Sequence, residues 1–541
     1  MSYSYEIKDF DAGGRIGNFK LGSKKLDTPN LFPVVNPFQN LISPKEFYNH
    51  FKIQAIFTNA YIIYKNRENN PNIIKKGLHE HLGFPGIIAT DSGGFQDYMY
   101  AGDIKLAPEE IEPFQEKIGS DCPVILDIPV QTTDPYEEAK RKVDITIRRA
   151  KDNILRRQRT DTAWFAPIHG SIYPDLLKVS SQEMSKLDYG IYAIGGVVKT
   201  FIDYRFDLDI EILLNVRKWI DPSKPLHMFG LGLPNFFSLA VACGADTFDS
   251  AAYILYAKDD RYFTFTGTKN IKDLSELPCH CPICIKYSAS EIQKLPKDKR
   301  TEVIARHNLY HSFSEIRTIK QAIREGTLWD LVEQRVHVHP KYIKALRKSI
   351  EFPDHFNQLL NMNKIKGQKL LSPFSFYRPH LQYFRKKIEN FKIFPSKKIL
   401  LCVPELDLPS DKGISFEGWK KEIKLNPYYE EIQVVIISNS LSIIPIELAE
   451  IYPAGQHEGF VNIEHKKKEI SILLSTFKKF LSENKSQFKF IKILIPITFV
   501  NEYQVQEQFQ PKNHLIYYIK NLISENFPEI KTSVIQTIEE L

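Results

Sequence analysis

The stretch FPGIIATDSGGFQ, residues 84–96, decides how the first part of this chain is expected to fold. Its apolar, partly β-branched half predicts a buried strand, and this strand gives way to a loop at Asp91. Asp91 is followed by a hydroxyl group, Ser92, and by a glycine pair that lets backbone and ligand approach closely. Because an Asp-Ser-Gly sequence is also typical of an ordinary turn, the rest of the chain must decide between a turn and a site.

The same pattern, a short apolar strand followed by a charged helical stretch, recurs along the chain. Between Ile16 and Arg335 the strand candidates are FPVVN, AIFTNA, GIIATD, PVILDIPV, WFAPIHG, GIYAIGGVV, LHMFGLG and ADTFDSAAY. About eight such units of roughly 30 residues predict an α/β fold, a (β/α)8 barrel of the TIM type. Polar and glycine residues recur at the expected strand ends and predict a pocket there: Asp91, Asp127, His169, Gly195, Gly196, Gly230 and Asp249.

The length of the chain, 541 residues, is too great for one hydrophobic core. We predict a catalytic barrel over residues 1–335, a Lys-rich connecting segment over 336–395, and a separate small α/β domain over 396–541. The strands of that last domain are expected in ILLCVP, VVIIS and IKILIP, in a mostly parallel sheet.

The composition is that of a folded protein, with 43% hydrophobic and 25% charged residues. A net charge of +7 permits an acidic partner such as RNA without requiring one. No apolar run approaches the roughly 20 residues that a membrane-spanning helix needs, and the start, MSYSYEIKDFDAGG, has the features of neither a signal peptide nor a transit peptide. A cytoplasmic location is therefore expected.

Three of the six cysteines lie within six residues, in CHCPICIKY. Cys279, Cys281 and Cys284 form a C-x-C-x-x-C group, which suits a tetrahedral zinc ion better than a disulfide framework. His307 is the predicted fourth ligand and His311 the alternative. Because four protein ligands leave no open position, we expect one structural zinc per subunit, in a subdomain over about 270–335. The chemistry would then belong to the carboxylates.

Several motifs of this chain occur together in one known family. They are TDSGGFQ, LDIPV, AIGGVV, HMFGLG, DTFDSAAYILYAKDDRY, and CHCPIC followed by RHNLY. In this order, over roughly residues 10–335, they resemble the tRNA-guanine transglycosylases, specifically the archaeal branch. The resemblance implies a homodimer that exchanges the guanine at position 15, in the dihydrouridine loop of tRNA, for 7-cyano-7-deazaguanine during archaeosine biosynthesis.

The resemblance also implies which carboxylates react. Base exchange with retained configuration is most simply achieved by two displacements, which need one carboxylate nucleophile and one acid/base group. Asp249 matches the nucleophile that attacks the anomeric carbon, and Asp91 matches the general acid/base. An older assignment of the family gives the nucleophile to the position of Asp91, so both assignments stay open at this point.

The residues that would bind the base follow from the same resemblance. Asp127 matches the acceptor for the N–H edge of the purine. The other residues assigned to base binding are Ser92 (a polar contact), Phe95 (an aromatic face), Gly195 and Gly196 (backbone hydrogen bonds) and Phe229. Taken without its motif, Phe95 could equally be a core residue.

One position departs from the family pattern. His169, in FAPIHGS, stands where the family usually has a glutamine that contacts the carbonyl group of the base. An imidazole with its proton on Nε2 can donate the same kind of hydrogen bond. We therefore expect function to survive, and any difference to fall on base selectivity or pH dependence.

The last third of the chain departs further. Archaeal members commonly end in a PUA domain, which we do not recognise before the final SVIQTIEEL. The stretch SNSLSIIPIELAEIYPAG, residues 438–455, resembles archaeosine synthases and the middle domains of archaeal transglycosylases. Because LLSPFSFYRPHLQYF lacks the synthase-type cysteine, we expect a non-catalytic domain that positions RNA. A separately encoded PUA-domain protein is a further expected partner on the same tRNA.

Two other classes of function are alternatives to an active transglycosylase. A paralogue could modify an already inserted deazaguanine or only bind tRNA, but it would be expected to have lost Asp91 or Asp249, and both are present. An unrelated barrel hydrolase, such as a glycosidase, would use two carboxylates but gives no reason for the cysteine cluster or for the ordered base-binding motifs.

Overall fold

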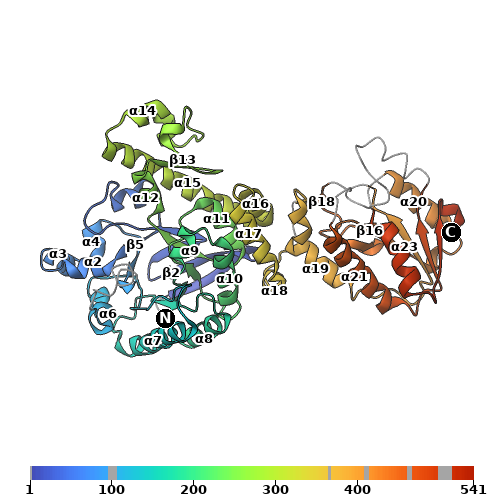
Figure 1. The fold of residues 1–541 in the computed structure, drawn as a ribbon, viewed down its shortest axis with the longest axis horizontal. Coiled ribbons are helices and arrows are strands. Elements are labelled where there is room, and N and C mark those ends of the chain that lie inside the picture. The colour runs from blue at the N-terminus through green and yellow to red at the C-terminus, as the bar shows by residue number, and fades with distance from the viewer. Residues whose placement is uncertain (1–2, 95–105, 363–366, 407–413, 460–465, 497–513) are drawn as a thin grey trace. The chain divides into compact units, whose positions relative to one another are not determined.

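The structure is a computed structural model that describes residues 3–94, 106–362, 367–406, 414–459, 466–496 and 514–541. The chain divides into two compact units. The first unit contains Met1–Arg324 and Gln334–Leu359, and the second contains Glu325–Glu333 and Leu360–Leu541. Both units combine helices and strands, so the chain is a mixed α/β protein as expected (Figure 1). None of the helices in the described ranges combines the length and the apolarity that a membrane crossing needs.

The centre of the first unit is made of parallel strands. Five of them pair in the order β4-β11-β10-β9-β8 and three in the order β5-β6-β7. Two isolated parallel bridges, Val34 with Phe57 and Val124 with Phe165, connect the two sheets at both of their edges. Each of these strands therefore has a parallel neighbour on either side. The bounds are β4 Asn30–Pro33, β5 Ala55–Asn59, β6 Ile87–Asp91, β7 Cys122–Pro123, β8 Phe165–Ile168, β9 Ile191–Ile194, β10 Leu226–Met228 and β11 Thr247–Ser250.

These strands overlap the apolar segments from which they were predicted, although β4 begins two residues before FPVVN. Every residue of β5, β8 and β9 is buried, as is typical of parallel strands that are covered on both faces. Strand β7 is much shorter than the predicted segment PVILDIPV. A proline has no backbone N–H to give to a sheet, and both Pro123 and Pro129 lie in this segment. The chain leaves the sheet after Val124, and the loop that follows carries Asp127.

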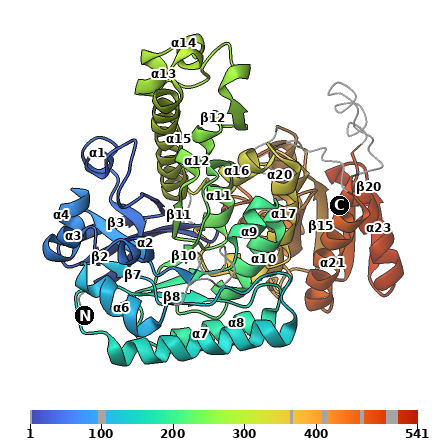
Figure 2. The same ribbon diagram turned by 60° about the vertical axis from the view of Figure 1, so that its left-hand side comes forward.

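Helices connect the strands and cover them. Helix α7 shows why: Ala139, Val143, Ile147 and Ala150 recur at helical spacing and are buried, while charged residues occupy the other face. Both α7 and α8 pack against β8 (Figure 2). The helices up to this point in the unit are α1 Pro44–Asn49, α2 Ala60–Lys65, α3 Pro71–Lys76, α4 Leu78–Leu82, α6 Pro108–Lys117, α7 Tyr136–Arg156, α8 Pro174–Ser185, α9 Val198–Ile202, α10 Phe206–Arg217, α11 Pro234–Ala242 and α12 Ala252–Lys258.

An antiparallel sheet precedes the parallel strands and was not predicted from the sequence. It consists of β1 Tyr3–Asp11, β2 Gly14–Leu21 and β3 Lys24–Thr28. Arg15 in β2 forms a salt bridge of 2.7 Å with Asp246, the residue before β11, and both side chains are buried. This pair fastens the antiparallel sheet to the amino-terminal end of a central strand.

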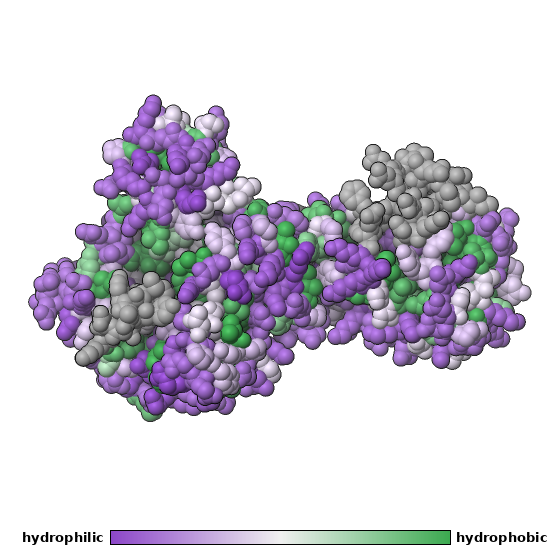
Figure 3. All heavy atoms as spheres, viewed as in Figure 1, coloured by the Kyte–Doolittle hydropathy of each residue, from purple (hydrophilic) through white to green (hydrophobic). Residues whose placement is uncertain are grey.

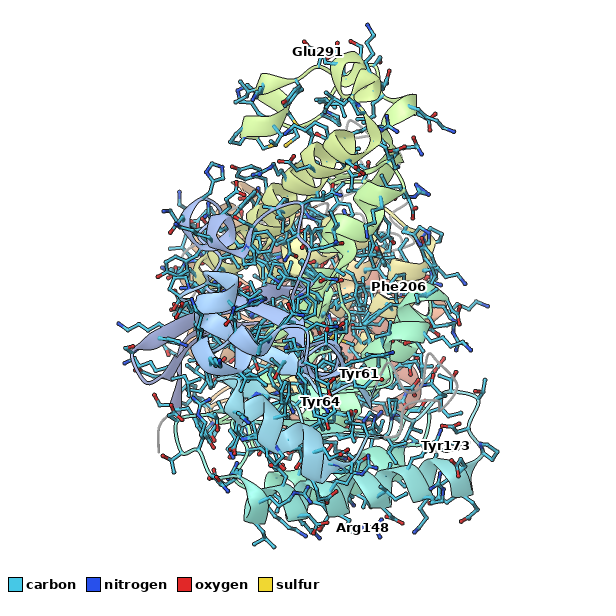
Figure 4. The ribbon with its side chains drawn as sticks, turned by 90° about the vertical axis from the view of Figure 1, so that its left-hand side faces the viewer. Tyr61, Tyr64, Arg148, Tyr173, Phe206 and Glu291 are labelled. Atoms are coloured by element: carbon cyan, nitrogen blue, oxygen red, sulfur yellow. The ribbon has the colours of Figure 1, made fainter. Side chains whose placement is uncertain are left out.

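A projection follows β11 and contains the predicted zinc subdomain. The long helix α15 connects it with the rest of the first unit, and Figure 4 shows Glu291 on α14 at the far end of the unit from Arg148 on α7. The elements of this part and of the end of the unit are β12 Arg261–Thr264, β13 Gly267–Asn270, α13 Pro282–Lys286, α14 Ala289–Lys294, α15 Lys297–Glu325, α17 Pro340–Ile350 and α18 Pro353–Asn357. Helix α16, Leu328–Val336, belongs mostly to the second unit.

The second unit has its own sheet, in the order β17-β16-β15-β19-β20. All pairs are parallel except β16 with β17. The predicted segment ILLCVP is β15, while β16 and β19 overlap VVIIS and IKILIP and begin two residues and one residue earlier. The elements are β14 Gln368–Lys369, α19 Pro379–Ile388, β15 Ile399–Pro404, α20 Ile414–Leu425, β16 Ile432–Ser438, β17 Ser442–Pro445, β18 His457–Glu458, α21 Lys467–Asn484, β19 Phe490–Leu494, α23 Leu515–Asn526 and β20 Lys531–Ile535.

Asp246→Asn is expected to destabilise the first unit strongly. The carboxylate of Asp246 accepts hydrogen bonds from Arg15, from Tyr5 and from the backbone of Leu226, so its loss leaves the Arg15 charge buried and unpaired. Breaking a buried pair in this way costs about 3–5 kcal/mol. Thermal unfolding should show a lower Tm, whereas Asp144→Asn, which removes an exposed partner of Lys140 on α7, should leave Tm unchanged. Equal effects of the two changes would contradict this account.

Candidate active site

The carboxyl ends of the parallel strands surround a cavity of about 600 Å³ in the first unit. Three carboxylates line it: Asp91, Asp127 and Asp249. The predicted residues Gly195, Gly196 and Phe229 also belong to its wall. Parallel strands bring their carboxyl ends to one edge, which is why residues so distant in the sequence meet here.

The outer part of the cavity wall comes from two short helices, α9 and α12. Ile202 and Leu255 are exposed apolar residues there, and Lys199 and Lys258 accompany them. Figure 3 shows hydrophobic residues gathered on this face of the first unit, beneath the projection that carries α13 and α14. The mouth of the cavity therefore combines apolar surface with positive charge, which suits a flat, anionic ligand such as a nucleotide.

Asp91 ends β6 and pairs in register with Asn59 of β5. The Asn59 side chain donates a hydrogen bond of 2.9 Å to Asp91 Oδ2, and the backbone N–H of Gly93 donates one of 3.2 Å to Oδ1. Both oxygens of Asp91 thus accept hydrogen bonds from neutral donors. Asn59 was not predicted from the sequence, although its place at the end of a strand is the same signal that pointed to Asp91.

Asp249 lies in β11, and its contacts differ from those of Asp91. Its Oδ1 accepts a hydrogen bond of 3.0 Å from His227 Nε2 and another of 3.0 Å from the backbone N–H of Gly230. Oδ2 has no hydrogen-bond partner among the described residues. One oxygen of this carboxylate is therefore held by two donors while the other is unengaged. His227 is completely buried in β10 and was also missed by the sequence analysis.

Asp127 is paired with the residue that departs from the family pattern. His169 is buried, and its Nε2 lies 2.7 Å from Asp127 Oδ2. His169 is not part of the cavity wall, whereas Asp127 is. A Cβ atom at Gly195 would overlap the imidazole, so a glycine is needed there for the histidine to fit. In the described residues His169 thus contacts the site through Asp127.

Of the two remaining predicted contacts, Ser92 and Phe95, only Ser92 is among the described residues. Ser92 is buried, and its hydroxyl group donates a hydrogen bond of 2.9 Å to the backbone carbonyl of Ile125, away from the cavity wall. Phe95 lies outside the described residues. Gly196 has a positive φ of 78°, and a Cβ there would overlap the carbonyl oxygen of Val130, so this turn requires glycine.

The predicted metal ligands come together in the projection. The ligand atoms of Cys279, Cys281, Cys284 and His307 all lie within 4.8 Å of one another. His307 Nδ1 is 3.5 Å from the Cys281 sulfur and 3.4 Å from the Cys284 sulfur. Metal–sulfur bonds of about 2.3 Å and metal–nitrogen bonds of about 2.0 Å in a tetrahedron give separations close to these. The group could therefore hold a metal ion.

The orientation of His307 fits such a role. Its Nε2 lies 2.8 Å from the backbone carbonyl of Phe263, so this nitrogen carries the proton and Nδ1 presents its lone pair to the sulfur atoms. Tyr262 stacks on the imidazole at a centroid distance of 3.6 Å and holds the ring in place. His311, the alternative ligand, is outside the cluster. Its burial, and to a lesser extent the neighbouring His307, lowers the pKa of His311 to about 4.

Comparison with known proteins connects these features to one family. The family model described as queuine tRNA-ribosyltransferase matches residues 9–341. The tRNA-guanine(15) transglycosylase of Methanococcus aeolicus is 39% identical over 459 residues, which are 84% of this chain and 68% of that protein. The proteins of the same name from Methanosarcina barkeri and Methanosarcina mazei are 38% and 42% identical, covering 82% and 77% of this chain and 92% and 84% of their own lengths.

Cys281→Ser is expected to lower both the metal content and the thermal stability of the protein. A metal site with four protein ligands contributes to folding, and one lost thiolate weakens it. Elemental analysis of the purified protein and its Tm should change together. Cys402→Ala, a change at a buried cysteine of the second unit, should leave the metal content of the protein unchanged. A Cys281→Ser protein that contains no metal but has the Tm of the wild-type protein would contradict the prediction.

Proposed function

The chain belongs to the queuine tRNA-ribosyltransferase family, and from this premise we propose that it is a tRNA-guanine transglycosylase. Its reaction is a pentosyl transfer in which guanine 15 of tRNA is exchanged for 7-cyano-7-deazaguanine, a step of archaeosine biosynthesis. The observation that carries this proposal is the meeting of Asp91, Asp127 and Asp249 around one cavity. Two reacting carboxylates and one base-recognising carboxylate are what such an exchange needs.

The scaffold is a closed (β/α)8 barrel in this proposal. The support for closure is that the five-stranded and three-stranded parallel sheets are bridged at both edges, at Val34–Phe57 and at Val124–Phe165. A barrel explains why the functional groups gather on one side, because the active sites of such barrels lie at the carboxyl ends of the strands.

Asp249 is the nucleophile. Its Oδ2 has no hydrogen-bond partner among the described residues, so this oxygen can approach C1′ of the target nucleotide without first breaking a bond. The bond from Oδ2 to C1′ forms as the bond from C1′ to the guanine nitrogen breaks. The product is a covalent RNA–protein ester with the guanine released.

Asp91 is the general acid/base. In its protonated form it gives its proton to the departing guanine, and the resulting carboxylate then removes a proton from the incoming base. The incoming base attacks C1′ and releases the carboxylate of Asp249, so protons and bonds balance over the cycle. Both oxygens of Asp91 already accept hydrogen bonds, which makes this carboxylate the less available nucleophile of the two.

Asp127 recognises the base, with one oxygen held by His169. The second oxygen can accept from the N–H edge of the purine. Because His169 is behind the cavity wall, we assign it an indirect role, in contrast to the direct contact of the glutamine that the family usually has at this position. Phe229, Gly195 and Gly196 complete the binding surface of the base.

The metal is one structural zinc ion per subunit. Three thiolates and one imidazole form a donor set that zinc prefers, and four protein ligands leave no position for a reacting water. The ion would fold the projection and take no part in the exchange.

The substrate tRNA would be bound by a homodimer, with the second unit positioning the RNA. The support for both statements is the family resemblance, as it is for a PUA-domain partner. Light scattering on the eluted protein at micromolar concentration should give twice the mass of one chain, and a monomer would reject the dimer.

Labelled guanine should be incorporated into tRNA by the purified protein without other components, and 7-cyano-7-deazaguanine should displace that label. Asp91→Asn and Asp249→Asn should each reduce the rate by at least about a thousandfold, because each removes a group that takes part in bond making or proton transfer. Asp144→Asn on the surface of α7 is the matched control and should retain full activity. A wild-type protein that binds tRNA but exchanges no base would instead favour the binding paralogue.

A further inference from the structure

We propose that His227 is a positioning residue that holds Asp249 in its reactive orientation. This inference rests on the proposed function, because it explains how one carboxylate of that site is prepared for attack. His227 touches neither the cavity nor any reacting atom, so its effect on the reaction must pass through Asp249.

The hydrogen bonds of His227 define its protonation. Nε2 lies 3.0 Å from Asp249 Oδ1, and Nδ1 lies 2.9 Å from the hydroxyl oxygen of Thr247. An ionised carboxylate can only accept, so Nε2 must carry a proton. In a neutral ring Nδ1 is then the acceptor, and the Thr247 hydroxyl group donates to it. Thr247 pairs in register with His227 across β10 and β11, so the sheet places this hydroxyl group beside Nδ1.

The surroundings of the imidazole prevent it from turning away. Its side chain is completely buried. Four phenylalanine rings surround it, with centroids at 5.0–5.9 Å: Phe32, Phe57, Phe165 and Phe229. A donor held in a water-excluded setting exerts a stronger and better directed force on a carboxylate than the same donor in water.

The consequence concerns which oxygen of Asp249 reacts. His227 and the backbone N–H of Gly230 both bind Oδ1, one from a neighbouring strand and one from the loop after it. Two donors on one oxygen fix the plane of the carboxylate and leave Oδ2 as the attacking atom. Without His227 only one donor remains, and the carboxylate can rotate out of line.

Two substitutions of His227 distinguish a role in positioning Asp249 from a role that only fills space in the core. The amide nitrogen of glutamine reaches about as far as Nε2 of histidine, whereas that of asparagine reaches only to the place of Nδ1. His227→Asn should therefore lower kcat about 10- to 100-fold with KM for tRNA and for guanine within about twofold. His227→Gln should recover most of the loss. Single-turnover formation of the covalent adduct should follow kcat in both variants.

Stability and tautomer measurements keep the test independent of the activity. Both variants should retain their metal content, and their Tm values, compared with each other, show whether folding differs between them. Nitrogen NMR of histidine-labelled protein should find His227 protonated on Nε2 in the absence of any substrate. If wild-type protein shows this tautomer but exchanges no base, the proposed function fails and the hydrogen-bond geometry stands. If Gln and Asn variants of equal Tm have equal kcat, or if Nδ1 carries the only proton, the inference about His227 is overturned.

Discussion

Parallel pairing of the strands of the first unit is the constraint on which its site depends. Strands that run in one direction end at one edge, and the register places Asp91 of β6 beside Asn59 of β5 and His227 of β10 beside Thr247 of β11. A shift of one residue in either pair would move the side chains to the other face of the strand. Asp91 and Asp249 are thus positioned by the backbone hydrogen bonds of their strands, more rigidly than a flexible loop could position them.

A second layer of contacts distinguishes the carboxylates from one another. His169 holds one oxygen of Asp127 and His227 holds one oxygen of Asp249, and both imidazoles are buried. In each pair a single oxygen remains for the substrate. Asp91 instead has both oxygens engaged, one by the Asn59 side chain and one by the backbone N–H of Gly93. The different roles proposed for the three carboxylates therefore follow from their neighbours and not from their residue type.

The sequence predicted the outline of the fold well but not the contacts between its distant parts. Apolar segments ending in Asp91, Asp127 and Asp249 carried a strong signal, as did the close spacing of the cysteines. The antiparallel sheet β1–β3 carried little, because β1 is mostly exposed and lacks a clear apolar pattern. The salt bridge between Arg15 and Asp246 attaches this sheet to the parallel strands, and the two residues are too far apart in the sequence for a local pattern to predict the contact. In the sequence His227 is an ordinary strand residue. Its hydrogen bond to Asp249 becomes visible only in the structure, because Asp249 lies two positions after Thr247, the residue that pairs with His227 in the sheet.

The account rests most heavily on Asp249 as the nucleophile, and peptide mapping of the trapped RNA–protein adduct tests it most directly. Exchange would be started on tRNA in the absence of any incoming base, the complex digested, and the peptide carrying the ribose identified by mass spectrometry. The account predicts the ribose on the peptide that contains Asp249. A ribose on the peptide that contains Asp91 would contradict it and reverse the roles of the two carboxylates.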